Sequence, residues 1–214
     1  MKNLVGVAAL MVCVGAANGA VIVQSQPWAF PLSPGGDNLV FNQFDASLGT
    51  LTKVELFIGG FIGANATAEN TSTLDAPGFG LSLTGNFSAV FESLSAAGLV
   101  NSVFAQALAA SDDGGVGNGS GPDFHDYGSI GDVFNDDDST MVGLAPYIGL
   151  GTINAVLSGS AGFSFFGTTD ALLGIDNLGT IGEVVVVYTY DEIPAPGALA
   201  LFGAAGLAAT RRRR

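Results

Sequence analysis

The chain has 214 residues, a formal net charge of −13 and one cysteine. All nineteen acidic residues but only one basic residue, Lys53, lie between residues 21 and 192, so this middle part has a formal charge of −18. Such a surface repels phosphate backbones and argues against nucleic-acid binding. Hydrophobic residues make up 48% of the chain, which is too many for a disordered acidic tail and enough for the core of one domain.

The first twenty residues have the pattern of a signal peptide. Lys2 gives a positive start, residues 4–14 form an apolar run, and small residues follow among positions 16–20. This order predicts export, with cleavage by signal peptidase between residues 17 and 21. Cys13 would be removed with this segment, so the mature protein would have neither a disulfide bond nor a thiolate metal site.

Residues 21–192 are expected to form one all-β domain, a single antiparallel β-sandwich of the jelly-roll type. Short apolar alternations separated by Gly, Ser, Thr, Asn and Asp are typical of such folds. The alternations lie at residues 53–58, 79–83, 87–91, 153–157 and 184–190. Four consecutive valines, 184–187, favour a strand that is buried on both faces.

Two parts of this domain give more specific expectations. The segment Thr84-Gly85-Asn86 separates two alternations and predicts a hairpin turn between them. Residues 94–110 fit a helix, through the near-helical spacing of Leu99, Val103 and Ala107, but they also fit a strand. In an otherwise β-rich sequence we favour the strand.

The densest cluster of acidic residues lies in the segment 111–140, which is also rich in glycine and is expected to be a loop. Calcium binds several oxygen ligands on backbone that bends tightly, and such loops provide both. The candidate calcium ligands are Asp112, Asp113, Asp123, Asp126, Asp136 and Asp138. The segment has no Asp-x-Asp-x-Asp-Gly motif and no Glu, so a solvated acidic loop is the alternative.

No catalytic motif stands out in the domain, and we expect no enzymatic activity. His125 is followed by Asp126, but sequence neighbours rarely face each other as a catalytic pair, and no Gly-x-Ser-x-Gly motif accompanies them. Acidic residues are so numerous that no pair of them indicates a glycosidase. The aromatic residues that could stack on sugars are Trp28, Tyr127, Tyr147, Tyr188 and Tyr190. Strand position favours core packing for Tyr188 and Tyr190, and Trp28 is more typical of packing than of a sugar platform.

Residues 193–214 contain three ordered parts. Pro194-Ala195-Pro196 is followed by an apolar run, residues 198–209, and then by Arg211, Arg212, Arg213 and Arg214. As a helix, such a run spans about 18–23 Å, less than the roughly 30 Å of a bilayer core. Positive charge resists membrane crossing, so we expect the four arginines to stay in the cytoplasm. Because the apolar run is short, we expect a C-terminal hydrophobic sorting helix that attaches only transiently to the inner membrane. A marginal membrane helix or a disordered end is the alternative.

This tail resembles the PEP-CTERM sorting signal of bacterial surface proteins, in a variant that has Ala195 where the family usually has Glu. The resemblance implies cleavage near residues 194–196 by an exosortase-type membrane protease. It further implies delivery to the cell surface or the extracellular matrix of a bacterium that exports polysaccharide.

A second resemblance, to the choice-of-anchor E domain family, covers most of the domain. The opening motif of that family corresponds to residues 44–51, Phe-Asp-Ala-Ser-Leu-Gly-Thr-Leu, and residues 147–153 and 186–190 fit its later pattern. The family implies a β-rich module on exported bacterial proteins, and it carries no catalytic residues to transfer.

Two functions follow from these expectations. The first is a non-enzymatic structural or adhesive module at the cell surface or in the extracellular matrix, with calcium as a candidate cofactor. The second is a domain that binds or cleaves exported polysaccharide. A polysaccharide pull-down distinguishes the two, because only the second predicts binding.

Overall fold

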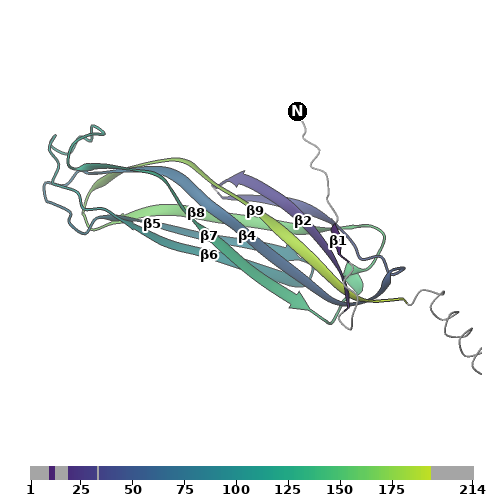
Figure 1. Ribbon diagram of the computed structural model, residues 1–214. Coiled ribbons are helices and arrows are strands. Elements are labelled where there is room, and N and C mark those ends of the chain that lie inside the picture. The colour runs from purple at the N-terminus through teal and green to yellow at the C-terminus, as the bar shows by residue number, and fades with distance from the viewer. Residues whose placement is uncertain (1–9, 13–18, 33, 194–214) are drawn as a thin grey trace, which may run out of the picture.

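The computed structural model describes residues 10–12, 19–32 and 34–193. Most of the expected signal peptide and all but Ile193 of the expected sorting segment lie outside these residues. The described chain forms two antiparallel β-sheets packed face to face (Figure 1), so the expected all-β sandwich is confirmed. The elements are β1 (Leu10–Val12), β2 (Ala20–Pro31), β3 (Gly35–Asn42), β4 (Gly49–Asn70), β5 (Gly80–Phe91), β6 (Leu94–Ala105), β7 (Phe124–Thr140), the 3-10 helix η1 (Ala145–Tyr147), β8 (Thr152–Phe166) and β9 (Ala171–Glu192).

The strand order shows how the chain winds between the two sheets. One sheet has the order β1-β2-β9-β4-β7, and the other has the order β3-β8-β5-β6. Apart from the short β1, the first strand pairs with the last and the pairing continues inward: β2 with β9, β3 with β8, β4 with β7 and β5 with β6. This nested pairing, divided between two sheets, is the jelly-roll arrangement.

The body is long and narrow (Figure 1). The longest strands, β4 and β9, each have 22 residues, and a strand of that length extends about 70 Å. Gly49 pairs with Glu192, and Asn70 pairs with Ala171, so the two strands run side by side over the whole body. The start of β2 and the end of β9 lie at one end, the terminal end, and loop 106–123 lies at the other, the loop end.

Inward-facing residues of both sheets form the apolar core. In β9, Val184 and Val186 are fully buried, whereas Val185 and Val187 are half-buried. The expected strand 184–190 is therefore confirmed, but it is covered fully on one face only. The reason is that a two-layer sandwich leaves the outer face of each sheet open to solvent.

A stack of aromatic rings crosses the core between the sheets. Between ring centroids, Phe134 of β7 lies 4.1 Å from Phe87 of β5 and 6.1 Å from Trp28 of β2. Trp28 in turn stacks on Phe30 at 5.2 Å. Gly98 of β6 lies against the Phe134 ring, because a Cβ at this position would be 2.5 Å from the ring carbon Cδ2. The aromatic packing therefore requires a glycine here.

Toward the loop end the sandwich narrows to three strands per sheet. β2 ends at Pro31, opposite Gly179, and β3 begins at Gly35, opposite Gly159. Beyond these points β9, β4 and β7 face β8, β5 and β6. A second, smaller apolar cluster fills this half and consists of Ala66, Ala68, Ala76, Phe79, Leu81 and Leu108.

Two expectations about strands have different outcomes. Residues 94–105 form β6, so the strand interpretation of the ambiguous segment is confirmed there. The expected turn at residues 84–86 is wrong, because β5 runs unbroken and pairs with both β6 and β8. Pairing on both edges holds Gly85 in the strand. The hairpin turn lies instead at residues 92–93, where Glu92 has a φ of 55°.

The acidic segment 111–140 is not one loop, contrary to expectation. Residues 124–140 form β7, an edge strand that pairs with β4. Two of the glycines that suggested a loop have strand roles. Gly128 lies at a bulge, and Gly131 lies so close to β4 that a Cβ would collide with the Ile62 carbonyl.

Candidate functional site

The structure separates the six aspartates expected to bind calcium. Asp112, Asp113 and Asp123 lie in loop 106–123 and Asp126 lies at the start of β7, whereas Asp136 and Asp138 lie near the far end of β7. Among the described residues, no group of three or more His, Cys, Asp or Glu side chains is placed to hold one metal ion. The six residues therefore do not form one site, and the two groups make different contacts.

Asp136 and Asp138 bind the backbone of the neighbouring edge strand. The N–H of Ala97 donates to Asp136 Oδ2 at 2.6 Å, and the N–H of Ser95 donates to Asp138 Oδ2 at 2.9 Å. Both donors belong to β6, which is the last strand of its sheet and pairs with β5 on its other side. The two carboxylates therefore take the place of a strand partner and close one side of the sandwich.

Asp132 continues this row of carboxylates along β7. It accepts hydrogen bonds from the Ser102 hydroxyl of β6 and from the N–H of Val133. These bonds stabilise the charged form and hold the pKa of Asp132 below its ordinary value. Three acidic residues of β7, Asp132, Asp136 and Asp138, thus have structural partners on β6. The sequence did not reveal these contacts because it does not show which strand edges meet.

Two glutamines close the opposite side of the sandwich. The Gln24 amide donates to the Asn42 carbonyl and accepts the Asn42 N–H, both at 2.9 Å. The Gln26 amide donates to the Val40 carbonyl at 3.0 Å. Asn42 and Val40 belong to β3, which is the edge strand opposite β6 in the sheet β3-β8-β5-β6. On both sides of the body, side chains from the sheet that contains β2 and β7 therefore form hydrogen bonds with backbone groups at the edges of the other sheet.

Glu69 fixes loop 106–123 against the end of β4. This side chain is 3% exposed, and its two carboxylate oxygens accept the N–H groups of Asn118 and Gly119, each at 2.9 Å. Hydrogen bonds from successive backbone N–H groups to one carboxylate are strong and directional. The loop is therefore held in a defined position although it contains five glycines at positive φ.

Asn70, next to Glu69, is the buried polar centre of the loop end. Its amide donates to the carbonyls of Leu74 and Ala109 at 2.9 and 2.7 Å. Its Oδ1 accepts the N–H of Ser72 at 3.2 Å and the hydroxyl of Thr168 at 2.8 Å. The sequence contains a signal for this residue, because Asn70 continues the inward-facing positions of Ala64, Ala66 and Ala68 and is the first polar residue among them.

His125 and Asp126 do not form a catalytic pair. The His125 ring packs edge-on against Tyr127, with 4.6 Å between centroids. Asp126 Oδ1 accepts the N–H of Gly128 at 2.8 Å. Consecutive side chains of a strand point to opposite faces, so the imidazole and the carboxylate point apart.

Most aromatic residues considered for sugar stacking are core residues. Trp28, Tyr147, Tyr188 and Tyr190 are each at most 5% exposed. The Tyr147 hydroxyl donates to the Phe91 carbonyl and the Tyr188 hydroxyl donates to the Asn42 carbonyl, both at 3.1 Å. Burial raises the pKa of Tyr188 well above its ordinary value. The exposed aromatic rings are phenylalanines instead, among them Phe57, Phe61 and Phe166.

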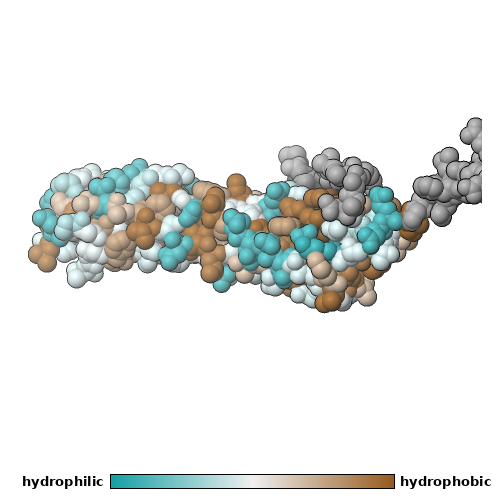
Figure 2. Space-filling view, turned by 60° about the horizontal axis from the view of Figure 1, so that its bottom comes forward, coloured by the Kyte–Doolittle hydropathy of each residue, from teal (hydrophilic) through white to brown (hydrophobic). Residues whose placement is uncertain are grey.

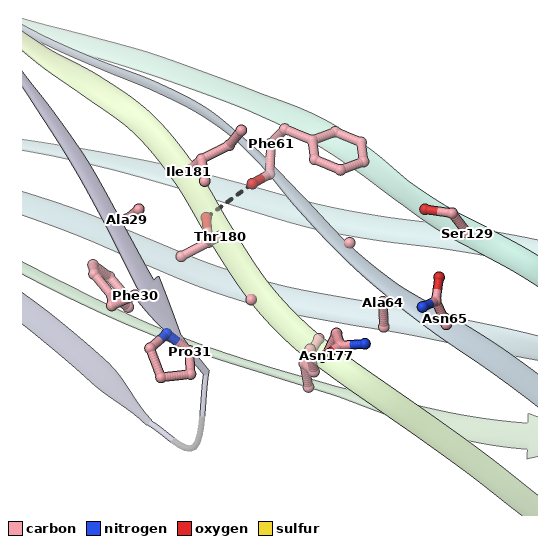
Figure 3. Close-up of a pocket in the computed structure, with 13 residues that line it drawn as sticks. Ala29, Phe30, Pro31, Phe61, Ala64, Asn65, Ser129, Asn177, Thr180 and Ile181 are labelled. Carbon is pink, nitrogen blue, oxygen red and sulfur yellow. Dashed lines mark hydrogen bonds between the residues drawn. The ribbon is translucent and has the colours of Figure 1, made fainter.

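An open groove of about 560 Å³ lies on the outer face of the sheet that contains β2, β9, β4 and β7 (Figure 3). It forms where β2 ends and where the pairing of β4 with β9 shifts register between Gly63 and Asn65. Asn177 of β9, with a φ of 57°, lies at this irregularity. Phe61 and Ile181 line the groove and are 40% and 59% exposed.

The groove combines an exposed aromatic ring with amide and hydroxyl groups. Figure 3 shows Asn65 of β4, Asn177 of β9 and Ser129 of β7 around the same hollow as Phe61. The Thr180 hydroxyl donates to the Phe61 carbonyl at 3.0 Å and ties β9 to β4 beneath it. An aromatic face and neighbouring amides can together bind a small polar ring.

A row of outward-facing apolar residues crosses the sheet and forms part of the groove lining. Ala29 pairs with Ile181, Ile181 with Phe61 and Phe61 with Val133. Val133 is 65% exposed. Figure 2 shows that apolar side chains also gather in a band near the middle of the body. The outer surface therefore combines acidic and apolar regions.

Comparisons with known proteins do not place this chain in a family. No family model and no curated protein matches it. A solved structure of the infectious bursal disease virus Gx strain is 12% identical over 93% of this chain and 48% of that chain, with a TM-score of 0.23. The VP2 subviral particle of that virus is 13% identical over 99% of this chain and 54% of that chain, with a TM-score of 0.13. The chain thus spans about half the length of these viral chains, and likenesses this weak establish nothing about function.

The described residues include no helix that is long and apolar enough to cross a membrane. The candidate sorting residues Pro194, Ala195, Pro196 and Arg211 to Arg214 lie outside the described part of the chain. Within the expected signal peptide, β1 pairs with residues 21–23 of β2. The sorting role of the two chain ends remains a prediction from their sequences.

Proposed function

We propose that this chain is an exported bacterial surface or extracellular-matrix protein whose β-sandwich is a non-enzymatic structural or adhesive module. Support comes from the signal-peptide pattern of residues 1–20 and from the tail, residues 193–214, which resembles a PEP-CTERM signal. Signal peptidase removes the first segment. An exosortase-type protease then cleaves near residues 194–196, after the tail has attached transiently to the inner membrane.

The observation that carries this proposal is the position of the two ends of the body. Ala20 pairs with Tyr190, so the body begins and ends at the terminal end. Loop 106–123 lies at the other end, one strand length of about 70 Å away. A tail that follows Glu192 therefore holds the body by one end and leaves the loop end facing outward. Such an arrangement suits a module displayed on a surface.

The charge of the body fits an extracellular setting. Its formal charge of −18 follows from nineteen acidic residues and one lysine, and Lys53 Nζ already bonds the Glu55 carboxylate at 2.7 Å. A large net charge of one sign favours solubility and attracts cations rather than phosphate backbones. These properties support a role outside the cell and weigh against a nucleic-acid partner.

The motif that resembles choice-of-anchor E domains has a structural role in this body. Phe44 is buried against Tyr190, with 5.1 Å between ring centroids. Asp45 Oδ1 accepts the N–H of Ser47 at 2.8 Å, and the Leu48 N–H donates to the Asp45 carbonyl at 3.1 Å. The motif thus forms a tight turn that leads into β4. A turn with defined residue requirements supports the proposal that the likeness reflects a shared module.

Deleting residues 194–214 in the producing bacterium tests the sorting proposal. We expect the truncated protein to be exported but to be lost from the surface and matrix fractions. Ala195→Glu, which restores the residue usual in the family, is the matched control and should be delivered like the natural chain. Equal surface delivery of the truncated protein would contradict the proposal.

The groove on the outer face supports a second candidate function, binding of exported polysaccharide. Sugar rings stack on exposed aromatic faces, and amide groups bond their hydroxyls. Phe61 offers such a face, and Asn65 and Asn177 lie beside it. The ligand class for this groove is therefore a neutral polysaccharide, since an acidic polymer would be repelled by the charge of the body.

A polysaccharide pull-down with the full chain and two variants tests this second function. Phe61→Ala should abolish retention. Phe57→Ala removes a ring that is 37% exposed on the same strand but does not line the groove, and it should leave retention unchanged. No retention of the natural chain, or equal retention of both variants, would exclude the groove as the binding site. Turnover of the polymer would instead show an enzyme.

A further inference from the structure

A fully buried carboxylate in loop 106–123 has one oxygen without a partner. Asp123 is 0% exposed, and its Oδ2 accepts the N–H of Asp112 at 3.1 Å. Its Oδ1 is buried and has no hydrogen-bond partner among the described residues. An unpaired buried carboxylate oxygen is more costly than an unpaired neutral group, so a bound partner would stabilise this position.

The unpaired oxygen lies close to the carboxylate of Asp112, next to the backbone of Gly121. A Cβ built on Gly121 would lie 2.8 Å from Asp123 Oδ1 and 2.7 Å from Asp112 Oδ2. By the sum of these distances, the two oxygens are at most 5.5 Å apart. Two oxygens on opposite sides of one calcium ion, each about 2.3–2.6 Å from it, have a similar separation. Gly121, at a φ of 101°, has no side chain, so both carboxylates can approach its backbone and each other.

Basic side chains do not compensate this charge. Lys53 is the only Lys or Arg between residues 21 and 192, and it bonds Glu55 near the terminal end. His125 follows two residues after Asp123, and its ring packs against Tyr127. A bound cation would supply the positive charge that the described residues around Asp123 do not.

Asp113, in the same loop, also has a carboxylate oxygen without a hydrogen-bond partner among the described residues. Its Oδ1 accepts hydrogen bonds from the Ser111 hydroxyl and from the N–H groups of Gly115 and Val116. Its Oδ2 is buried and has no hydrogen-bond partner among the described residues. The loop therefore holds two buried oxygens with free acceptor capacity, and Glu69 fixes the backbone that carries them.

We propose that loop 106–123 binds one divalent cation of the calcium type between the carboxylates of Asp112 and Asp123. Calcium takes six to eight oxygen ligands, and backbone carbonyls and waters commonly complete the set, so two carboxylates suffice as charged ligands. Few protein ligands imply a weak site, with a Kd of roughly 10⁻⁴–10⁻³ M, as in extracellular modules. Such a site depends on the geometry of the loop and not on the export of the chain.

The test is the calcium response of the full chain, purified in mild detergent, treated with EDTA and then freed of the chelator. Calcium at 10 mM should raise the melting temperature by about 3–6 °C, the shift expected for a ligand at about tenfold its Kd. Magnesium at the same concentration should have a smaller effect, because it demands octahedral geometry and gives up water reluctantly. Equilibrium dialysis with calcium should show one specific ion per chain.

Three variants of equal charge change separate this site from general attraction to an acidic surface. Asp123→Asn should abolish the calcium shift. Asp112→Asn changes an exposed side chain, so it leaves folding intact and should weaken binding at least tenfold. Asp137→Asn, on β7, is the matched control and should respond like the natural chain. No calcium shift in the natural chain, or the same shift in all three variants, would overturn the proposal.

Discussion

The backbone N–H of Ala97 donates a 2.6 Å hydrogen bond to the carboxylate of Asp136, which belongs to the opposite sheet. Each residue lies on the last strand of its own sheet, so the bond joins two edges. An unpaired edge is a template for pairing with other chains, and charged side chains are a known protection. The acidic row of β7 therefore protects the β6 edge as well as contributing charge.

Asp136→Ala should destabilise the body and expose the β6 edge. Loss of this carboxylate leaves the Ala97 N–H to water, and we expect the free energy of unfolding to fall by about 1 kcal/mol. Urea unfolding measures this change, and light scattering measures association. Asp137→Ala removes the same charge one residue away, where the carboxylate makes no hydrogen bond to the described residues of β6, and it should change stability by less than about 0.5 kcal/mol. Equal effects of the two substitutions would argue against edge protection.

Stability should decrease in acid through Asp132, among other carboxylates. The Ser102 hydroxyl lowers the pKa of Asp132 in the folded state. Its contribution is therefore complete above the ordinary pKa and is lost as the pH falls through the lower, folded value. Ser102→Ala should raise the pKa of Asp132 toward its ordinary value. A carboxyl-carbon NMR titration measures this shift, and the pKa of Asp45, which Ser47 lowers, should stay unchanged as a control.

Gly98→Ala should be destabilising because the new Cβ meets the Phe134 ring at 2.5 Å. Overpacking of this kind costs about 1–3 kcal/mol. Gly162→Ala is the matched control, since a Cβ there would have no atom of the described residues within 4 Å. In a strand, alanine should then stabilise by about 0.5 kcal/mol. Chemical denaturation of both variants checks the sign, and a neutral Gly98→Ala would contradict the aromatic stack.

Asn70→Ala should be the most destabilising of these substitutions. It removes four hydrogen bonds at a fully buried position and leaves the Leu74 and Ala109 carbonyls without their donor. We expect a loss of about 2–4 kcal/mol in the free energy of unfolding. Asn65→Ala, on the exposed side of the same strand, should change it by less than about 0.5 kcal/mol. Hydrogen exchange should show faster opening of loop 106–123 in Asn70→Ala only.

Local sequence patterns predicted the fold class because inward and outward positions alternate along β4, β6 and β9. They failed where glycine has a role that depends on a neighbouring strand. The sequence predicts a turn at Gly85, yet this residue lies in a strand that is paired on both edges. The glycine-rich segment predicts a loop that includes Gly128 and Gly131. Instead, Gly128 lies at a bulge of β7, and Gly131 allows β7 to lie close to β4. Whether these glycines lie in a strand or in a turn depends on the strands that pair with them, which local sequence does not show.

The sequence predicts which residue types the candidate site contains, but not which of them lie close together. The sequence indicated aspartates and glycines at the loop end, and the carboxylates of Asp112 and Asp123 do lie close together there. It did not show that Asp136 and Asp138 bind the β6 backbone, because that contact joins strands of different sheets. Nor does the sequence point to Phe61, because its exposure follows from the end of β2 and the irregular pairing of β4 with β9.

The intact mass of the native protein, isolated from the surface or matrix of the producing cell, tests the central claim most directly. Export and sorting predict a chain that begins between residues 18 and 21 and ends near residues 194–196. The measured mass would then lack Lys2, Cys13 and the four arginines, apart from any added group. A mass that still includes Arg211 to Arg214 would contradict the account.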